Sequence, residues 1–328
     1  MEWWPGATDQ RRHRNQNSER TSRAGDSPSW NAHRASVAMT RAMSAVADVT
    51  VFLLLIGAAV VTLVSGVGVE NPATTTNPAA EQASTLATST ASVEYDLLVP
   101  PSEHRRPPDH ATRRQRTSHG TVAELLGEAA MSSVTVGGER VSSAGTDFES
   151  RVAAATRDRL HSRGHRTSVR VTWAPYPGAP VSGEYRVGDR PPDTVDVRAA
   201  TVTVPSGMEN VSEPAREAAK TGGYDGVATV VARSVVDGLF PPTQSRYALR
   251  GDYPADVLMA TRYERMADLT GANVAVKRQS TVEMNRDLTA ALAARLRTDM
   301  RSRYDSPADA ASAVRTSRVR VTVRTWSP

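Results

Sequence analysis

The segment Arg318–Trp326, RVRVTVRTW, alternates valine with arginine or threonine near the C-terminal end of the chain. In an extended backbone the valines face one way, and the arginines and Thr322 face the other. The pattern therefore predicts a β-strand with one apolar face and one basic face. A second segment with the same alternation, Ser168–Trp173, is expected to pair with it in the antiparallel sense.

Further strand and helix signals surround these two segments. Strand material is predicted at Tyr185–Val187 and Thr194–Val204. Apolar residues recur at helical spacing in five segments, which are Thr121–Met131, Thr146–Leu160, Val227–Leu239, Pro254–Leu269 and Val282–Met300. A Thr-x-x-Glu capping box is expected at Thr146 and Glu149, and Gly271 is expected to cap a helix C-terminus. Together these signals predict an α+β domain, a small antiparallel sheet packed with helices.

An uncharged apolar run, Val49–Val69, stands in the N-terminal part of the chain. As a helix, 21 residues are about 32 Å long, close to the hydrocarbon thickness of a bilayer. We therefore expect a transmembrane helix, and the region 41–69 reads as an entry motif followed by this span. A secretory signal peptide cleaved near Ser65–Gly68 is the alternative, although its apolar region ordinarily has only about 7 to 15 residues.

The charges beside this run set the expected orientation. Residues 1–41 carry seven arginines and four acidic residues, whereas residues 70–89 carry no lysine or arginine. Basic flanks stay on the cytoplasmic side, so the N-terminus is expected in the cytoplasm and the C-terminal portion outside the cell. Residues 1–40 have too little aliphatic content for a core and are expected to be a disordered basic tail. Translation from Met39 instead of Met1 is the alternative start.

Two more segments are predicted to lack a packed core. Residues 70–94 are rich in Thr, Ser, Ala and Pro, which predicts a stalk between the span and an exported domain, 95–328. Residues 103–118 combine arginines with prolines and polar residues, so a mobile loop is expected there, with polyanion contact as the alternative. The arginines of this cluster are Arg105, Arg106, Arg113, Arg114 and Arg116.

The residues before the span resemble the processing site of archaeal type IV pilin-like precursors. Arg41-Ala42-Met43 leads into the apolar helix, and in such precursors a prepilin-type peptidase cuts between a basic-plus-small pair and the apolar stretch. The resemblance implies cleavage between Ala42 and Met43. Asp48 then lies close to the helix N-terminus, where the helix dipole favours a carboxylate. It is read either as an interfacial acidic cap or as the partner of a neighbouring subunit's N-terminal amine.

The sequence contains no recognisable catalytic or cofactor motif. It has no cysteine, which excludes thiol chemistry and cysteine-ligated metals. No GxSxG, P-loop or GxGxxG motif occurs. His161 and His165 stand four apart without further ligands, so no metal is expected. With three phenylalanines the chain lacks a base-stacking platform, and no nucleic acid is expected as a partner. Asn210 begins a candidate N-glycosylation sequon.

Longer motifs carry a wider resemblance. They are Ser92–Pro100 (SVEYDLLVP), His119–Leu126 (HGTVAELL), Ala174–Pro180 (APYPGAP) and Leu239–Pro254 (LFPPTQSRYALRGDYP). With the entry motif and the single span, they resemble an uncharacterised family of membrane-anchored proteins from halophilic archaea. That family is placed among type IV pilus-like and secretion-like components. The resemblance extends from about Arg41 to the C-terminus and implies no established activity.

These observations favour a membrane-anchored surface protein. We expect a pilin-like or minor-pilin-like structural subunit without catalytic activity or cofactors, single-pass in the cell membrane. Its expected partners are the lipid bilayer, other pilin-like or secretion-system-like membrane proteins and a prepilin-type peptidase. A permanently anchored extracellular binding or accessory module is the first alternative, and an exported membrane-tethered enzyme is the second.

Overall fold

A computed structural model describes residues 77–99, 115–160, 164–276 and 278–328. The chain divides into two compact units, Met1–Asn71 and Pro72–Pro328, and every described residue belongs to the second. The predicted span and its entry motif lie outside the described residues. Within those ranges, no helix combines the length and the apolar composition that a membrane crossing requires.

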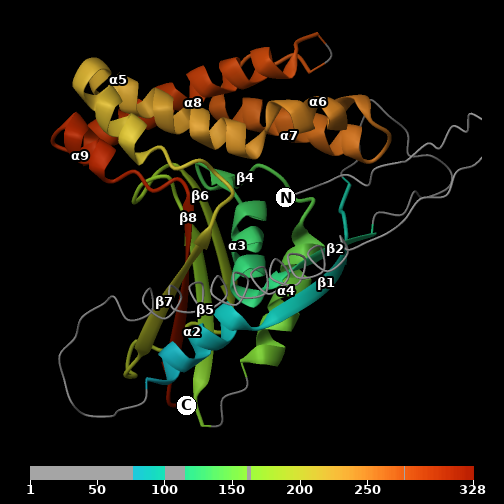
Figure 1. Cartoon of the computed structure of the whole chain (residues 1–328), viewed down its shortest axis with the longest axis vertical. Coiled ribbons are helices and arrows are strands. Elements are labelled where there is room, and N and C mark those ends of the chain that lie inside the picture. The colour runs from blue at the N-terminus through green and yellow to red at the C-terminus, as the bar shows by residue number, and fades with distance from the viewer. Residues whose placement is uncertain (1–76, 100–114, 161–163, 277) are drawn as a thin grey trace, which may run out of the picture. The chain divides into compact units, whose positions relative to one another are not determined.

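The described unit has an α+β fold (Figure 1). The strands are β1 (Thr90–Asp96), β2 (Gln115–Thr121), β3 (Thr135–Val136), β4 (Glu139–Arg140), β5 (Arg166–Trp173), β6 (Val181–Val187), β7 (Arg198–Pro205) and β8 (Arg318–Trp326). The helices are α2 (Pro78–Thr88), α3 (Val122–Ser132), α4 (Thr146–Arg159), α5 (Ser212–Leu239), α6 (Pro242–Arg250), α7 (Ala255–Thr270), α8 (Thr281–Arg303) and α9 (Pro307–Ser312).

The main sheet has six strands in the order β4-β3-β6-β5-β8-β7, and β1 pairs with β2 in a separate ribbon. All neighbouring strands are antiparallel. The predicted pairing of the two alternating segments is confirmed, because Val169 lies opposite Val323 and Val171 lies opposite Val321. Cross-strand valines on one face give the sheet a continuous apolar side.

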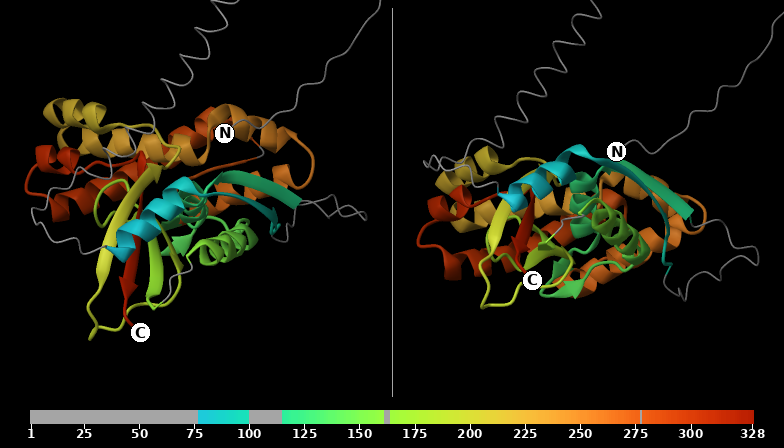
Figure 2. Two further views of the ribbon diagram at one scale, coloured as in Figure 1. Left: turned by 60° about the horizontal axis from the view of Figure 1, so that its bottom comes forward. Right: turned by 90° about the horizontal axis from the view of Figure 1, so that it is seen from below.

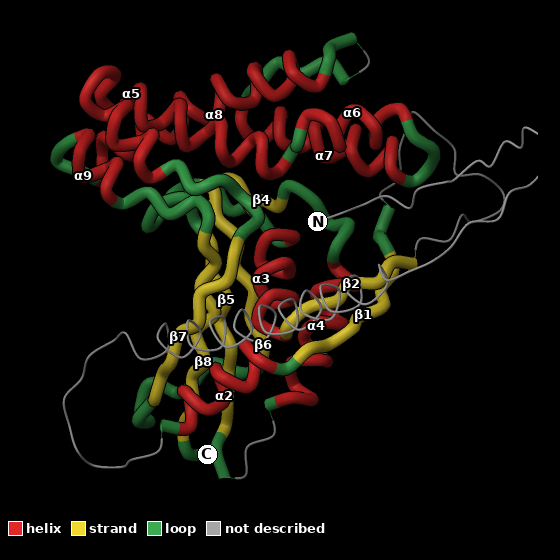
Figure 3. The backbone as a smooth tube through the Cα atoms, in the orientation of Figure 1, coloured by secondary structure: helices red, strands yellow, loops and turns green. Residues whose placement is uncertain are grey.

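Helices α2 and α3 pack on this apolar side of the sheet, and α4 packs on α3 and β1 (Figure 3). The approach of α3 is close because the facing residues are glycines. A Cβ on Gly183 would lie 2.2 Å from the carbonyl oxygen of Ala130, and one on Gly127 would lie 2.7 Å from a methyl group of Val204. The views in Figure 2 place α2 and the β1–β2 ribbon on the same side of the sheet.

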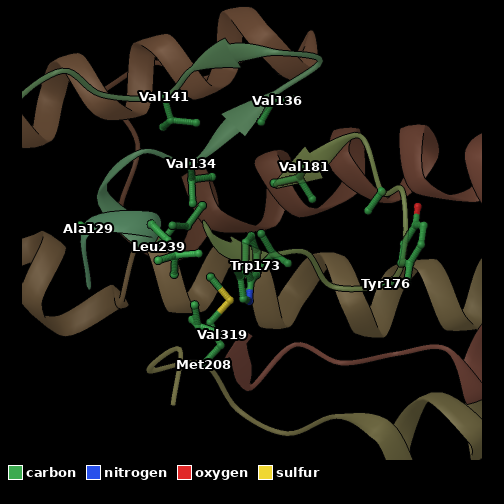
Figure 4. Packing of buried hydrophobic residues seen from close by; sticks show 14 of the residues in the cluster. Ala129, Val134, Val136, Val141, Trp173, Tyr176, Val181, Met208, Leu239 and Val319 are labelled. Atoms are coloured by element: carbon green, nitrogen blue, oxygen red, sulfur yellow. The ribbon is translucent and has the colours of Figure 1, made fainter. Parts of the chain in front are cut away.

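Helices α5 to α9 form a second layer at one end of the strands (Figure 1). The core continues between the main sheet and this helical layer, where Trp173, Met208, Leu239 and Val319 pack together (Figure 4). Helix α8 contributes the predicted stripe with four-residue spacing, and all its members are buried: Met284, Leu288, Leu292, Leu296 and Met300. Gly271 caps α7 with a φ of 77°, as the sequence predicts.

Three sequence predictions are wrong in the described part. The stalk predicted over residues 70–94 includes helix α2, whose Ala79, Ala83 and Leu86 are buried, so an alanine-rich segment supplies an apolar stripe despite its low complexity. The mobile loop predicted over 103–118 overlaps β2, which begins at Gln115.

The third wrong prediction is the capping box at the start of α4. The N-cap of this helix is Gly145 rather than Thr146, so the helix begins without a side-chain cap. Glu149 instead accepts a two-pronged hydrogen bond from Arg140 at 3.0 and 2.9 Å. Capping boxes occur elsewhere, at Thr121 with Glu124 and at Ser280 with Glu283.

Candidate functional site

The face of the main sheet opposite α3 carries a concentration of arginines, and we name it the arginine face. Cross-strand register places its side chains together from four strands. They are Glu184 and Arg186 of β6, Ser168, Arg170 and Thr172 of β5, Arg318, Arg320, Thr322 and Arg324 of β8, and Ala199, Thr201 and Thr203 of β7. Five arginines thus accompany one glutamate.

Register explains how residues far apart in the sequence meet on this face. Arg170 lies opposite Arg186 on one neighbouring strand and opposite Thr322 on the other. Arg320 lies opposite Thr172 and Thr203. Because directly opposed residues of antiparallel strands point to the same side, each strand adds its polar positions to one surface.

The single acid of the arginine face is shared by two arginines. Glu184 accepts hydrogen bonds from Nε and Nη2 of Arg170 at 3.0 and 2.9 Å and from Nη2 of Arg186 at 2.8 Å. These bonds lower the pKa of Glu184 to about 2, and the bonds from Arg170 are the largest cause of the shift. The same carboxylate raises the pKa of Arg170. The triad holds the two guanidinium groups in fixed positions on the sheet.

The arginines of β8 differ from this pair. Among the described residues, Arg318, Arg320 and Arg324 have no acidic partner within ion-pair distance, and Arg318 and Arg320 are exposed. Residues two apart on one strand face are separated by about 6.8 Å, so these side chains form a row along the strand. The threonines beside them are small, and a hydrogen bond of 3.2 Å joins the hydroxyl groups of Thr201 and Thr322.

Guanidinium chemistry limits what such a surface can do. Arginine keeps its charge throughout the physiological pH range and therefore does not act as a general acid or base there. Its planar fork of N–H donors matches carboxylate and phosphate oxygens. A row of arginines on a rigid sheet is consequently suited to binding anionic groups.

A concave region lies between α5 and α8. Its volume is about 590 Å³, and its wall includes Asp225, Arg233, Asp237, Asn285, Arg286 and Arg297 around a floor of alanines and threonines. Several of these groups bind one another. Asp225 pairs with Arg297 at 2.9 Å and with Arg301 at 3.3 Å, and Asn285 donates to Asp237 at 3.1 Å. In the described ranges, no group of three or more His, Asp or Glu side chains is arranged to hold a metal ion.

Most of the site residues predicted from the sequence fall where the structure gives no description. These are Arg41, Ala42, Met43, Asp48, Arg105, Arg106, Arg113 and Arg114. Arg116 belongs to β2, where it lies opposite Tyr95 and donates to the carbonyl of Gln115 at 2.9 Å. His165 is exposed, and His161 lies outside the described residues.

The sequon residue Asn210 is exposed directly before α5. Its Oδ1 accepts hydrogen bonds from the backbone N–H of Ser212 at 3.2 Å and from the Ser212 hydroxyl at 2.9 Å. The turn presents the sequon at the surface.

Arg170 and Arg186 were missed as site residues from the sequence. The alternation in Arg318–Trp326 predicts a strand with a basic face, but it does not show which residues of other strands join that face. The missing information was the register, since it sets which arginines lie side by side and which acid they share.

Residues 47–326 match a family of unknown function, DUF7284. No curated protein and no solved structure matches the chain. Because the matched region extends from the predicted span to the end of β8, it includes every strand of the arginine face. The chain therefore belongs to DUF7284, a family of unknown function.

Proposed function

We propose that this protein is a membrane-anchored surface subunit, pilin-like in its N-terminal organisation, that contacts an acidic partner through the arginine face. The apolar run Val49–Val69 supplies the anchor and its flanking charges place the C-terminal unit outside the cell. Cleavage after Ala42 leaves the apolar helix on the mature protein, with Asp48 near its start. The role is structural, in assembly with other membrane proteins.

The observation that carries the binding role is the row of Arg318, Arg320 and Arg324 on one face of β8, where Arg318 and Arg320 are exposed and Arg324 is half-buried. Surface arginines interspersed with acids are ordinary, but this row has no acid opposite it in the register. Its chemistry favours carboxylate-bearing or phosphate-bearing partners. An acidic protein surface is the partner that fits an assembly role.

The first test of the proposal is the N-terminal sequence of the protein recovered from native membranes. A start at Met43 supports pilin-type processing. A start at Met1 or Met39 contradicts it and favours a permanently anchored binding module. A start near Gly68 contradicts the anchor altogether, because the span is then removed with a signal peptide.

The second test addresses the arginine face. Full-length protein in detergent is titrated with labelled polyglutamate over a series of salt concentrations, and Arg320→Glu/Arg324→Glu is compared with the wild type. We expect at least a tenfold loss of affinity and a shallower salt dependence. Arg157→Glu/Arg159→Glu, which makes the same change of charge at two exposed positions of α4 on the other side of the sheet, is the matched control. Equal loss in both variants contradicts a role for this face.

A further inference from the structure

Strand β7 is an open edge of the main sheet. It is the last strand in the sheet order and pairs only with β8, and Figure 1 shows it at the margin of the sheet. Among the described residues, no backbone hydrogen bond joins the outward-facing groups of residues 199–204 to another segment. An edge strand of this kind presents a row of N–H and C=O groups that can pair with an added strand.

The two edges of the sheet are built differently. At the other edge, β4 has two residues, and both are charged and ion-paired: Glu139 with Arg265, and Arg140 with Glu149. Such short, charged edges resist pairing with other chains. Strand β7 has eight residues. It carries no charge from Ala199 to Val204 and its only proline, Pro205, is the last residue. Its register with β8 runs without a bulge.

The side chains on either side of β7 define what an added strand must carry. On the arginine face, the small residues Ala199 and Thr203 stand between the open edge and the arginines of β8, opposite Arg324 and Arg320 respectively. An added strand would lie about 9.6 Å from β8, two strand spacings. A glutamate of the added strand and an arginine of β8 can extend toward each other over Ala199 or Thr203 and meet across that gap.

The opposite side of β7 is apolar. Ala200 and Val202 are half-buried against the core, and α2 packs on this side of the strand. An added strand therefore places alternate residues beside α2, where apolar side chains are favoured, and the remaining residues beside the arginines.

We infer that β7 binds an extended partner segment by strand addition, and that this segment alternates acidic and apolar residues. The inference rests on the proposed function and specifies its partner and its mode of contact. Main-chain hydrogen bonds supply the pairing, and the arginines of β8 select acidic residues on one face of the added strand.

The test uses labelled eight-residue peptides and full-length protein in detergent, with binding followed by fluorescence anisotropy. The first peptide alternates valine and glutamate. The second has the same composition in two blocks, so its glutamates do not share a face. The third is the alternating peptide N-methylated on every residue, which removes its backbone donors along both edges. We expect the first peptide to bind at least tenfold more tightly than either of the others.

A charge-swap experiment tests the selection by arginine. Arg320→Glu/Arg324→Glu is expected to lose affinity for the valine–glutamate peptide and to gain affinity for a valine–lysine peptide. This reciprocal change does not follow from a loss of folding. Arg157→Glu/Arg159→Glu is expected to leave both affinities unchanged.

The outcomes separate this inference from the proposed function. If the N-methylated and alternating peptides bind equally well, the arginine face binds acids but strand addition is wrong. If no acidic peptide binds, both proposals are wrong. A dimer, detected by sedimentation, to which the alternating peptide does not bind also overturns the inference, because a second copy then occupies the edge.

Discussion

The indole Nε1–H of Trp173 donates a hydrogen bond to the carbonyl oxygen of Thr316 across 2.8 Å. Trp173 ends β5 and is 1% exposed, and Thr316 lies between α9 and β8. The same carbonyl accepts a hydrogen bond from the hydroxyl of Ser206, also at 2.8 Å. One buried oxygen thus ties the end of the sheet to the segment that enters it from the helical layer.

Replacing Trp173 with phenylalanine is expected to lower the free energy of unfolding by about 2 kcal/mol, from a lost hydrogen bond and a smaller buried ring. The loss stays moderate because Ser206 still satisfies the Thr316 carbonyl. Urea unfolding followed by circular dichroism measures it. Val282→Ala is the control, since Val282 is 66% exposed and surface changes typically alter stability by under about 0.5 kcal/mol. Equal midpoints for the two variants would show that the indole contact contributes nothing.

Gly183→Ala tests the close packing of α3 on the sheet. The new methyl group would lie 2.2 Å from the Ala130 carbonyl oxygen, and backbone has to move to relieve the clash. We expect a loss of about 3 kcal/mol or more in unfolding free energy. Gly222→Ala in α5 is the matched substitution, because its Cβ meets nothing within 4 Å. That variant is expected to be neutral or stabilised by up to about 1 kcal/mol, as alanine favours helix. Similar losses in both would contradict the packing argument.

Periodicity predicted the central elements of the fold well. The alternation in Arg318–Trp326 and Ser168–Trp173 identified two neighbouring strands, and the four-residue stripe of α8 identified its buried face. Composition failed at α2. A segment rich in alanine, serine and threonine looks like a linker, yet Ala79, Ala83 and Leu86 become a buried stripe once a sheet is present to cover. Tertiary packing decides whether such a segment is a helix or a linker, because its local propensity for helix is weak.

The candidate site was less predictable than the fold. The sequence of one strand shows which of its own residues share a face, and the pattern of Arg318–Trp326 predicts the basic face of β8. The meeting of Arg170, Arg186 and Glu184 depends on the pairing of β5 with β6, and the open edge depends on the strand order. Both are non-local properties, set by how the whole sheet assembles.

A buried amide connects three elements of the helical layer. Tyr263 of α7 donates to Oδ1 of Asn285 at 2.7 Å, and Nδ2 of Asn285 donates to the carbonyl of Phe240 at 2.7 Å. Asn285→Leu is similar in size but leaves the tyrosine hydroxyl and the carbonyl without these bonds. We expect a loss of about 2 to 4 kcal/mol in unfolding free energy.

Tyr263→Phe removes only one bond of this group and is expected to cost about 1 kcal/mol. If the groups form one network, the double variant loses less than the sum of the single losses. Urea unfolding of the four proteins completes this cycle. Strict additivity would mean that the two side chains act independently.

The glutamate of the arginine face predicts a specific dependence of stability on pH. Folding lowers the pKa of Glu184 from 4.5 to about 2, chiefly through its hydrogen bonds from Arg170. Its contribution is therefore fully present above the ordinary value and is lost as the pH falls toward the folded value. Glu184 is 45% exposed, so solvent screening keeps the effect small. The difference in unfolding free energy between wild type and Glu184→Gln should stay constant from neutral pH to about pH 5 and shrink as the pH falls from there toward 2. Arg170→Met should abolish most of this dependence, because it removes the main cause of the shift. A difference that stays constant over the range would show that the carboxylate is not held by its arginines in solution.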